Sequence, residues 1–157
     1  MTTLYLLCGL PGAGKSTRAH QITASTRAIH LSPDEWIPPL GLSLVDYEFR
    51  FKFQDVMLVH AGKLLALSLS TVIEFGSWAR DDREHIRQVG VAAGARTELH
   101  FLDAPVEELA RRVLDRGGPG AAALVAEVLP SADQFERPTP DEIARFDRYV
   151  GPGELFE

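Results

Sequence analysis

The sequence has one cysteine in 157 residues and lacks any long apolar run. A single cysteine cannot form an internal disulfide, which excludes a disulfide-stabilised secreted scaffold and is consistent with the reducing cytoplasm. No run approaches the roughly 20 apolar residues that a membrane-spanning helix needs. The apolar stretch at residues 4–8 is shorter than the core of a signal peptide and follows no basic residue. We therefore expect a cytoplasmic protein with no membrane segment.

Basic residues are also in short supply, with 16 Lys and Arg against 22 Asp and Glu and a net charge of −6. Affinity for nucleic acid comes mainly from Lys and Arg that neutralise phosphates, so a broad nucleic-acid-binding surface is not expected. A local basic pocket is still compatible with this charge. The length and the 45% hydrophobic content suit one substantial core. We predict a single domain over residues 1–157; the sequence does not indicate an oligomeric state.

Glycine and proline divide the chain into alternating short apolar runs and longer amphipathic segments. The expected strands are residues 3–8, 28–31, 71–75 and 97–102. The expected helices are residues 15–24, 44–70 with a weak point at Gly62, 81–93, a segment between Pro105 and Gly117, and a short turn from Pro140. Residues 32–39, SPDEWIPP, are expected to form a loop. Strands that alternate with helices predict an α/β fold with a parallel sheet covered on both faces.

The stretch GLPGAGKS at residues 9–16 fits the P-loop pattern in full and lies between an expected strand and an expected helix. In such a loop the glycines let backbone N–H groups surround phosphate oxygens at a helix N-terminus. Lys15 would reach the β- and γ-phosphates, and Ser16 would bind Mg²⁺. The alternative, a glycine-rich turn without a ligand, does not account for the whole pattern. The predicted nucleotide-binding residues are Gly9, Pro11, Gly12, Ala13, Gly14, Lys15, Ser16 and Thr17.

Further motifs follow the P-loop in a familiar order. They are LSPDE at residues 31–35, VIEFGSWAR at 72–80, LDAP at 102–105 and FERPTPDE at 135–142. With GLPGAGKST, this order resembles a family of small P-loop kinase-like ATP-binding proteins related to chloramphenicol phosphotransferase, zeta toxins and the kinase domain of polynucleotide kinase. The resemblance covers nearly the whole chain. It implies the P-loop NTPase fold with a five-stranded parallel sheet in the order 2-3-1-4-5, and ATP and Mg²⁺ as cofactors.

The resemblance also suggests roles for two carboxylates, one catalytic and one near the metal, and a catalytic role for Lys15. Asp34 matches the position that accepts the proton of the attacking hydroxyl, with Glu35 a weaker candidate. The local sequence Ser-x-Asp-Glu equally allows Ser32 or Asp34 to cap a helix. Glu74 matches a position near Mg²⁺ where the family often has aspartate, so its extra methylene is a departure. Glu74 could hold the metal through water, contact the substrate, or have a structural role.

Arginines near the transferring phosphoryl group are expected after the fourth strand. Arg111, Arg112 and Arg116 lie in that segment, and i,i+4 spacing from glutamates offers ordinary surface pairing as the alternative. We favour Arg116 as catalytic and Arg112, one turn earlier on the same helix face, as a nucleotide contact. The resemblance places Arg137 near the adenine, where a guanidinium could stack.

The acceptor is expected at the carboxyl ends of the strands. The candidate acceptor-binding residues are Asp34, Trp36, Trp78, Arg80 and Arg83. For the two arginines, surface ion pairing with Asp81, Asp82 or Glu84 is the alternative.

The leading functional prediction is an ATP- and Mg²⁺-dependent kinase that acts on a hydroxyl of a small molecule, for example an antibiotic, a sugar or a nucleoside. A second prediction is a nucleotide or polynucleotide 5′-kinase, although the acidic charge makes nucleic acid an unfavourable partner. A third is a non-catalytic ATP-binding regulator or toxin-like module. The shared fold does not select an acceptor.

Overall fold

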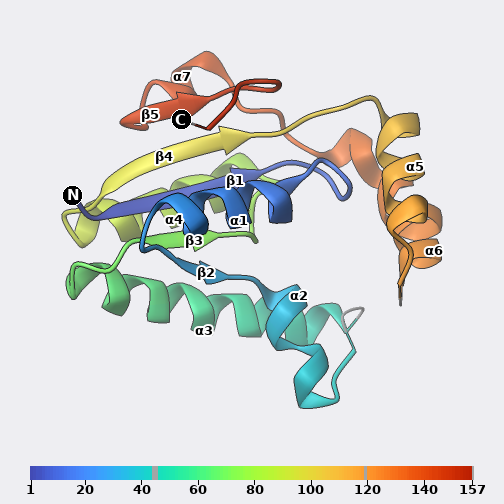
Figure 1. The fold of residues 1–157 in the computed structure, drawn as a ribbon, viewed down its shortest axis with the longest axis horizontal. Helices are drawn as coiled ribbons and strands as arrows, with labels where there is room; N and C mark the ends of the chain where they lie inside the picture. Colours follow the sequence, from blue (N-terminus) through green and yellow to red (C-terminus); the bar gives the residue numbers. More distant parts are fainter. Residues whose placement is uncertain (44–45, 119, 157) are drawn as a thin grey trace.

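The computed structural model describes residues 1–43, 46–118 and 120–156, and its centre is a five-stranded parallel sheet (Figure 1). The strands are β1 Thr3–Cys8, β2 Ile29–Leu31, β3 Thr71–Ile73, β4 Arg96–Phe101 and β5 Arg148–Val150. Their order is β2-β3-β1-β4-β5. The predicted α/β fold and the order 2-3-1-4-5 are therefore confirmed. The sequence had located only the first four strands.

Helices connect the strands as parallel pairing requires. Their bounds are α1 Lys15–Ser25, α2 Pro33–Trp36, α3 Tyr47–Ala66, α4 Arg80–Ala92, α5 Val106–Arg116, α6 Ala121–Ala123 and α7 Pro140–Ile143, with tighter or wider turns at η1 Pro38–Leu40, η2 Leu124–Val128 and η3 Leu129–Gln134. The prediction of a loop at residues 32–39 was wrong, because Pro33 starts α2 at a position where proline is tolerated. Helix α3 continues through Gly62 without a break, and residues 44 and 45 lie outside the described range.

The two faces of the sheet are covered by different helices because alternate side chains of β1 point in opposite directions. Leu4, Leu6 and Cys8 pack with residues of α3 and α4 on one face. Tyr5 and Leu7 pack with residues of α1 on the other face. None of the helices in the described ranges combines the length and the apolar character needed to cross a bilayer.

The carboxyl ends of the strands point toward α5 and α6, which stand beyond the sheet on the right of Figure 1. Helices α5 and α6 and the turns η2 and η3 are called the arm from here on. The turn after β1 packs against the arm through Leu10 and Ala13, which form a buried cluster with Leu109 of α5 and Leu129 of η3. The arm therefore has an apolar anchor next to the P-loop. Open parallel sheets bind ligands at this edge.

Candidate active site

The P-loop occupies the turn from β1 to α1 with the backbone geometry that its glycines allow. Gly12 has φ 83° and Gly14 has φ 98°, both in the left-handed region. A Cβ atom on Gly12 would lie 2.6 Å from the carbonyl oxygen of Leu109, so a larger residue would displace either the loop or α5. Helix α1 begins directly after Gly14, which directs its first N–H groups toward the loop.

The Lys15 side chain folds over this loop. Its Nζ donates hydrogen bonds to the carbonyl oxygens of Gly9 and Leu10, at 2.9 and 3.1 Å. Burial lowers the pKa of the ammonium, although the charges of Glu74 and Asp34 oppose that effect. The only cation of the predicted phosphate-binding loop is therefore bound to the loop backbone and interacts electrostatically with both predicted carboxylates.

Ser16, Glu74 and His30 form a hydrogen-bonded chain beside Lys15. The Ser16 hydroxyl donates to Glu74 Oε1 at 2.7 Å, and His30 Nε2 lies 2.7 Å from Glu74 Oε2. Burial alone would raise the pKa of Glu74, but the bonds from His30 and Ser16 outweigh it, so this pKa is lowered. Burial would likewise lower the pKa of His30, yet Glu74 raises it. The predicted metal residues Ser16 and Glu74 are therefore brought together, with Glu74 ionised.

His30 was missed by the sequence reasoning. It stands in β2 next to β3, because Leu31 pairs with Ile73 and the Glu74 N–H donates to the Leu31 carbonyl oxygen. A histidine inside an otherwise apolar strand was the available signal. Its partner, 44 residues away, could be found only from the strand order.

Asp34 lies at the start of α2 and points toward the cavity rather than capping its helix. Its carboxylate accepts a hydrogen bond from Arg50 Nη1 of α3 at 2.6 Å. Ser32 precedes α2 but makes no side-chain capping bond. The cap alternative for both residues is thus not realised. Arg50, the partner of Asp34, was also missed, and its place in the run YEFRFKFQ carried no distinguishing signal.

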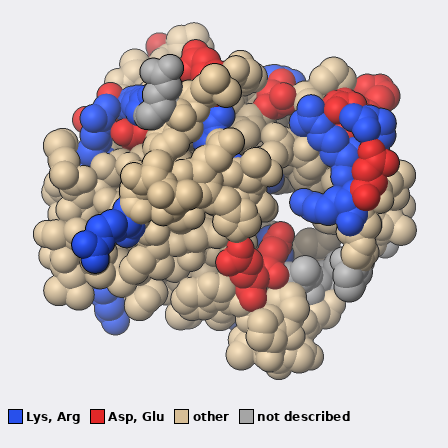
Figure 2. All heavy atoms as spheres, in the orientation of Figure 1, with Lys and Arg blue, Asp and Glu red and all other residues tan. Residues whose placement is uncertain are grey.

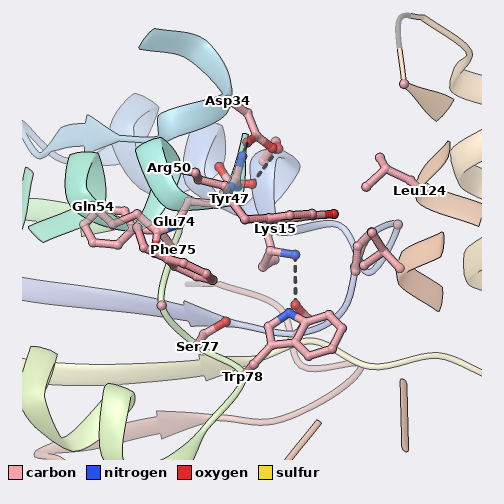
Figure 3. A pocket seen from close by; sticks show the side chains of 18 of the residues that line it. Lys15, Asp34, Tyr47, Arg50, Gln54, Glu74, Phe75, Ser77, Trp78 and Leu124 are labelled. Atoms are coloured by element: carbon pink, nitrogen blue, oxygen red, sulfur yellow. Dashed lines mark hydrogen bonds and ion pairs between the residues drawn. The ribbon is translucent and has the colours of Figure 1, made fainter. Parts of the chain in front are cut away.

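One cavity of about 1530 Å³ is lined by Lys15, Ser16, Asp34, Arg50 and Glu74. Figure 3 shows Lys15, Asp34, Tyr47 and Arg50 projecting toward this space, with Leu124 facing them from the other side. Cavities for one small ligand are commonly about 300–1000 Å³. The volume is therefore large enough for a nucleotide and a second small molecule together.

Aromatic side chains form much of the cavity wall away from the P-loop. Tyr47, Phe51, Phe75 and Trp78 all contribute, and Tyr47 and Phe51 stack with ring centroids 6.5 Å apart. Tyr47 and Phe51 are largely exposed, with 47% and 61% of their surfaces accessible. Exposed aromatic rings at the edge of a cavity can contact the apolar face of a ligand.

Arg112 and Arg116 of α5 line the cavity, and their contacts with the nucleotide and the phosphoryl group stay predictions. Arg111 is on the outside, where it pairs with Glu108 and Asp115 at 2.7 and 2.8 Å. Figure 2 shows acidic and basic side chains interleaved on this arm and a hollow between the arm and the rest of the protein. Among the described residues no carboxylate pairs with Arg116, whereas Arg112 Nε donates to Glu108 at 2.7 Å.

The prediction that Arg83 binds the acceptor was wrong. Its side chain is fully buried, and its guanidinium pairs with Glu142 of α7 through two bonds, one of them 2.8 Å from Nη2 to Oε2. A third donor, Nη1, bonds to the carbonyl oxygens of Ser77 and Trp78 at 2.8 and 3.2 Å. Arg83 therefore holds the turn after β3 in place instead of reaching a ligand.

Four further predicted residues lie outside the cavity lining, and one of them, Ala13, is buried in the cluster with Leu10 and Leu109. Trp36 lies in a separate shallow groove and packs edge-on against Phe53. Arg80 begins α4, and its backbone N–H donates to Glu136. Arg137 pairs with Asp103 at 2.6 Å. These placements lend no support to ligand contacts by Trp36, Arg80 or Arg137, while Trp78 does line the cavity.

Residues 4–138 match a family model described as an AAA domain. The chain belongs to the AAA domain family. The matched range includes the P-loop, Asp34, Glu74 and Arg116. No curated protein has a sequence that matches this chain.

Solved structures of a sugar kinase and a gluconokinase have a fold similar to that of this chain. A sugar kinase from Janibacter sp. HTCC2649 has 21% identity and a TM-score of 0.67, over 96% of this chain and 84% of that one. A gluconokinase from Sinorhizobium meliloti 1021 has 22% identity and a TM-score of 0.61, over 95% and 81%. The Pnkp1/Rnl/Hen1 complex contains a chain with 22% identity and a TM-score of 0.61, over 71% and 38%. The domain thus has a P-loop kinase-like fold.

Proposed function

We propose that this protein is an ATP- and Mg²⁺-dependent phosphotransferase that transfers the γ-phosphoryl group to a hydroxyl of a small molecule. The observation that carries the proposal is the shared cavity, in which the P-loop with Lys15 and a carboxylate at Asp34 face the same space. Phosphoryl transfer asks the protein to align a nucleophile, to neutralise charge and to take up one proton. Each of these tasks has a candidate group in that cavity.

The cofactor site is built from hard oxygen donors, as Mg²⁺ prefers. The Ser16 hydroxyl and the Glu74 carboxylate lie 2.7 Å apart, and Glu74 is kept ionised by its hydrogen bonds. These two residues therefore fit the metal, which when bound would screen the charge of the phosphates. Lys15 and the N–H groups of the loop would hold the β- and γ-phosphates.

Asp34 is the proposed base. The acceptor oxygen forms a bond to the γ-phosphorus, the bond from that phosphorus to the β–γ bridging oxygen breaks, ADP leaves, and Asp34 takes the hydroxyl proton. Arg50 is a positioning residue, because its 2.6 Å bond fixes the direction in which the carboxylate points. Arg116 and Arg112 on α5 are proposed to neutralise charge on the phosphoryl groups.

The charges around the acceptor part of the cavity favour an uncharged or cationic hydroxyl compound. Asp34, Asp55 and Asp82 line the cavity, and Arg50 is already paired with Asp34. The other basic residues of the lining, Lys15, Arg112 and Arg116, are the ones proposed to hold the phosphates. A polyanion such as a nucleic acid would be repelled by this arrangement. The likeness in fold to a sugar kinase and a gluconokinase is compatible with a polyhydroxylated acceptor.

The test is an Asp34→Asn variant, assayed with the acceptor that supports transfer by the wild-type protein. Turnover should fall by roughly 10²-fold or more, the usual scale of general acid–base catalysis. ATP affinity should stay within about threefold, because Asp34 is not part of the P-loop. Asp115→Asn is the matched control, since this exposed carboxylate on α5 is outside the cavity.

Equal turnover of Asp34→Asn and wild-type protein would remove Asp34 as the base. A wild-type protein that phosphorylates only 5′-hydroxyl oligonucleotides would favour the polynucleotide kinase alternative. ATP binding without transfer to any hydroxyl compound would favour the ATP-binding module.

A further inference from the structure

Three potential metal ligands come together at the outer edge of the sheet, apart from the residues that line the nucleotide cavity. They are His20 on α1, His30 in β2 and Glu35 on α2. One ligand atom from each lies within 4.8 Å of the other two. Glu35 Oε1 is 3.4 Å from His30 Nδ1 and 3.9 Å from His20 Nε2. Three separate elements therefore converge on one point at the surface.

We propose that His20 Nε2, His30 Nδ1 and the Glu35 carboxylate bind a divalent transition-metal ion, with Zn²⁺ as the probe of choice. Two imidazoles and one carboxylate are a ligand set that Zn²⁺ accepts, with a fourth position left for water. Zn–N and Zn–O bonds of about 2.0–2.1 Å place tetrahedral ligand atoms roughly 3.3 Å apart. The His30–Glu35 pair is already near this separation. His20 and Glu35 have side chains 69% and 50% exposed, so they have room to close the remaining gap.

The surroundings of His30 supply a second and independent observation. A metal-binding histidine usually donates its other ring N–H to a carboxylate, which fixes the ring and its tautomer. His30 Nε2 lies 2.7 Å from Glu74 Oε2, and the His30 side chain is only 10% exposed. With the proton on Nε2, the lone pair of Nδ1 points toward Glu35 and the site. The buried ligand is thus held in place while the two exposed ligands complete the set.

This position connects the metal site with the P-loop. Glu74 accepts from His30 through one oxygen and from Ser16 through the other, each at 2.7 Å. A metal ion bound to His30 would replace any proton at Nδ1, so the remaining ring proton would stay on Nε2 and keep its hydrogen bond to Glu74. Occupancy of the site would therefore stabilise the orientation in which Glu74 meets Ser16. The metal site itself does not depend on the proposed kinase activity.

The test uses the full-length protein, freed of metal by chelation and titrated at pH 7.5 without nucleotide. Co²⁺ as a spectroscopic probe should give visible absorption bands typical of nitrogen and oxygen ligands, and one equivalent of Zn²⁺ should abolish them. Zinc affinity is then measured by competition with a chromogenic chelator. His20→Ala and Glu35→Gln should each lower it by roughly tenfold or more, since even the loss of an outer hydrogen-bond partner costs 10–100-fold. Both residues are exposed, so these variants should fold.

Two controls separate this site from other binding. His60→Ala removes an exposed histidine of α3 far from the cluster in sequence and should leave zinc affinity unchanged. Lys15→Ala disables the P-loop and should also leave it unchanged, which distinguishes failure of the metal site from failure of the kinase proposal. The proposal is overturned if wild-type protein gives no Co²⁺ bands. It is also overturned if His20→Ala and His60→Ala bind Zn²⁺ equally well, because His30 then serves only as a charge partner of two glutamates.

Discussion

A Glu142→Gln substitution should destabilise the protein strongly, although Glu142 lies far from the P-loop in the sequence. The Arg83 and Glu142 side chains are 0% and 2% exposed, and the two bonds between them are the main compensation for burying both charges. Removing one partner of a buried ion pair typically costs about 3–5 kcal/mol of unfolding free energy. Glutamine keeps one acceptor but turns an N–H₂ group toward a guanidinium donor. We therefore expect a loss of about 3 kcal/mol, the lower part of that range.

Urea unfolding followed by far-UV circular dichroism measures this loss. With an m-value of about 2 kcal/mol/M, the midpoint should fall by about 1.5 M. The matched control is Glu48→Gln, which breaks an ion pair with Lys52. The Glu48 and Lys52 side chains are 81% and 73% exposed. That change should cost about 0.5 kcal/mol or less. If Glu142→Gln were as harmless as Glu48→Gln, the pair would not be a buried, charge-stabilised link, and Arg83 would not have the structural role described above.

Three other predictions concern the loop, the arm and the thiol. Arg116→Ala should lower turnover by roughly 10²-fold with little change in ATP affinity, because Arg116 lines the cavity. Arg111→Ala, on the outer face of α5, should behave as wild type. Equal effects of the two changes in steady-state kinetics would contradict a role of Arg116 in phosphoryl transfer. Gly12→Ala should abolish ATP binding in calorimetry, because its φ is 83° and its Cβ would meet the Leu109 carbonyl, while unchanged affinity would show that the loop tolerates a side chain. Burial raises the pKa of Cys8 to about 12, so iodoacetamide at pH 8 should label the thiol slowly in the native protein and rapidly in urea; rapid native labelling would refute this burial.

The local parts of the site were predictable from sequence, because a P-loop is one contiguous stretch in which each residue has its own task. The order of the strands came from the resemblance to P-loop kinases and not from periodicity, which carries no information on neighbours. The short strand β5 was missed because Arg148, Tyr149 and Val150 form only three residues between polar turns. Helix α2 was missed because Pro33 at its start and the pair Pro38 and Pro39 after it suggested a loop.

Contacts between residues far apart in the sequence could not be predicted. Arg83 is surrounded in sequence by Asp81, Asp82 and Glu84, so local pairing was the expected alternative to acceptor binding, yet its partner is Glu142, 59 residues away. The pairing of Asp34 with Arg50 depends on how α3 folds back across α2. A sequence read locally supplies the chemical groups, whereas these partnerships arise only when the sheet and its helices pack together.

Kinase activity is measured by following transfer of the label from [γ-³²P]ATP in the presence of Mg²⁺ and purified protein. The acceptors are sugars, nucleosides, other small hydroxyl compounds and 5′-hydroxyl oligonucleotides. The wild-type protein should label at least one small hydroxyl compound and Lys15→Ala should label none, since Lys15 lies over the phosphate-binding loop and faces the cavity shared with Asp34. The proposed kinase activity is refuted if wild-type protein binds ATP but transfers phosphate to no acceptor, or if Lys15→Ala protein transfers it as well as wild type.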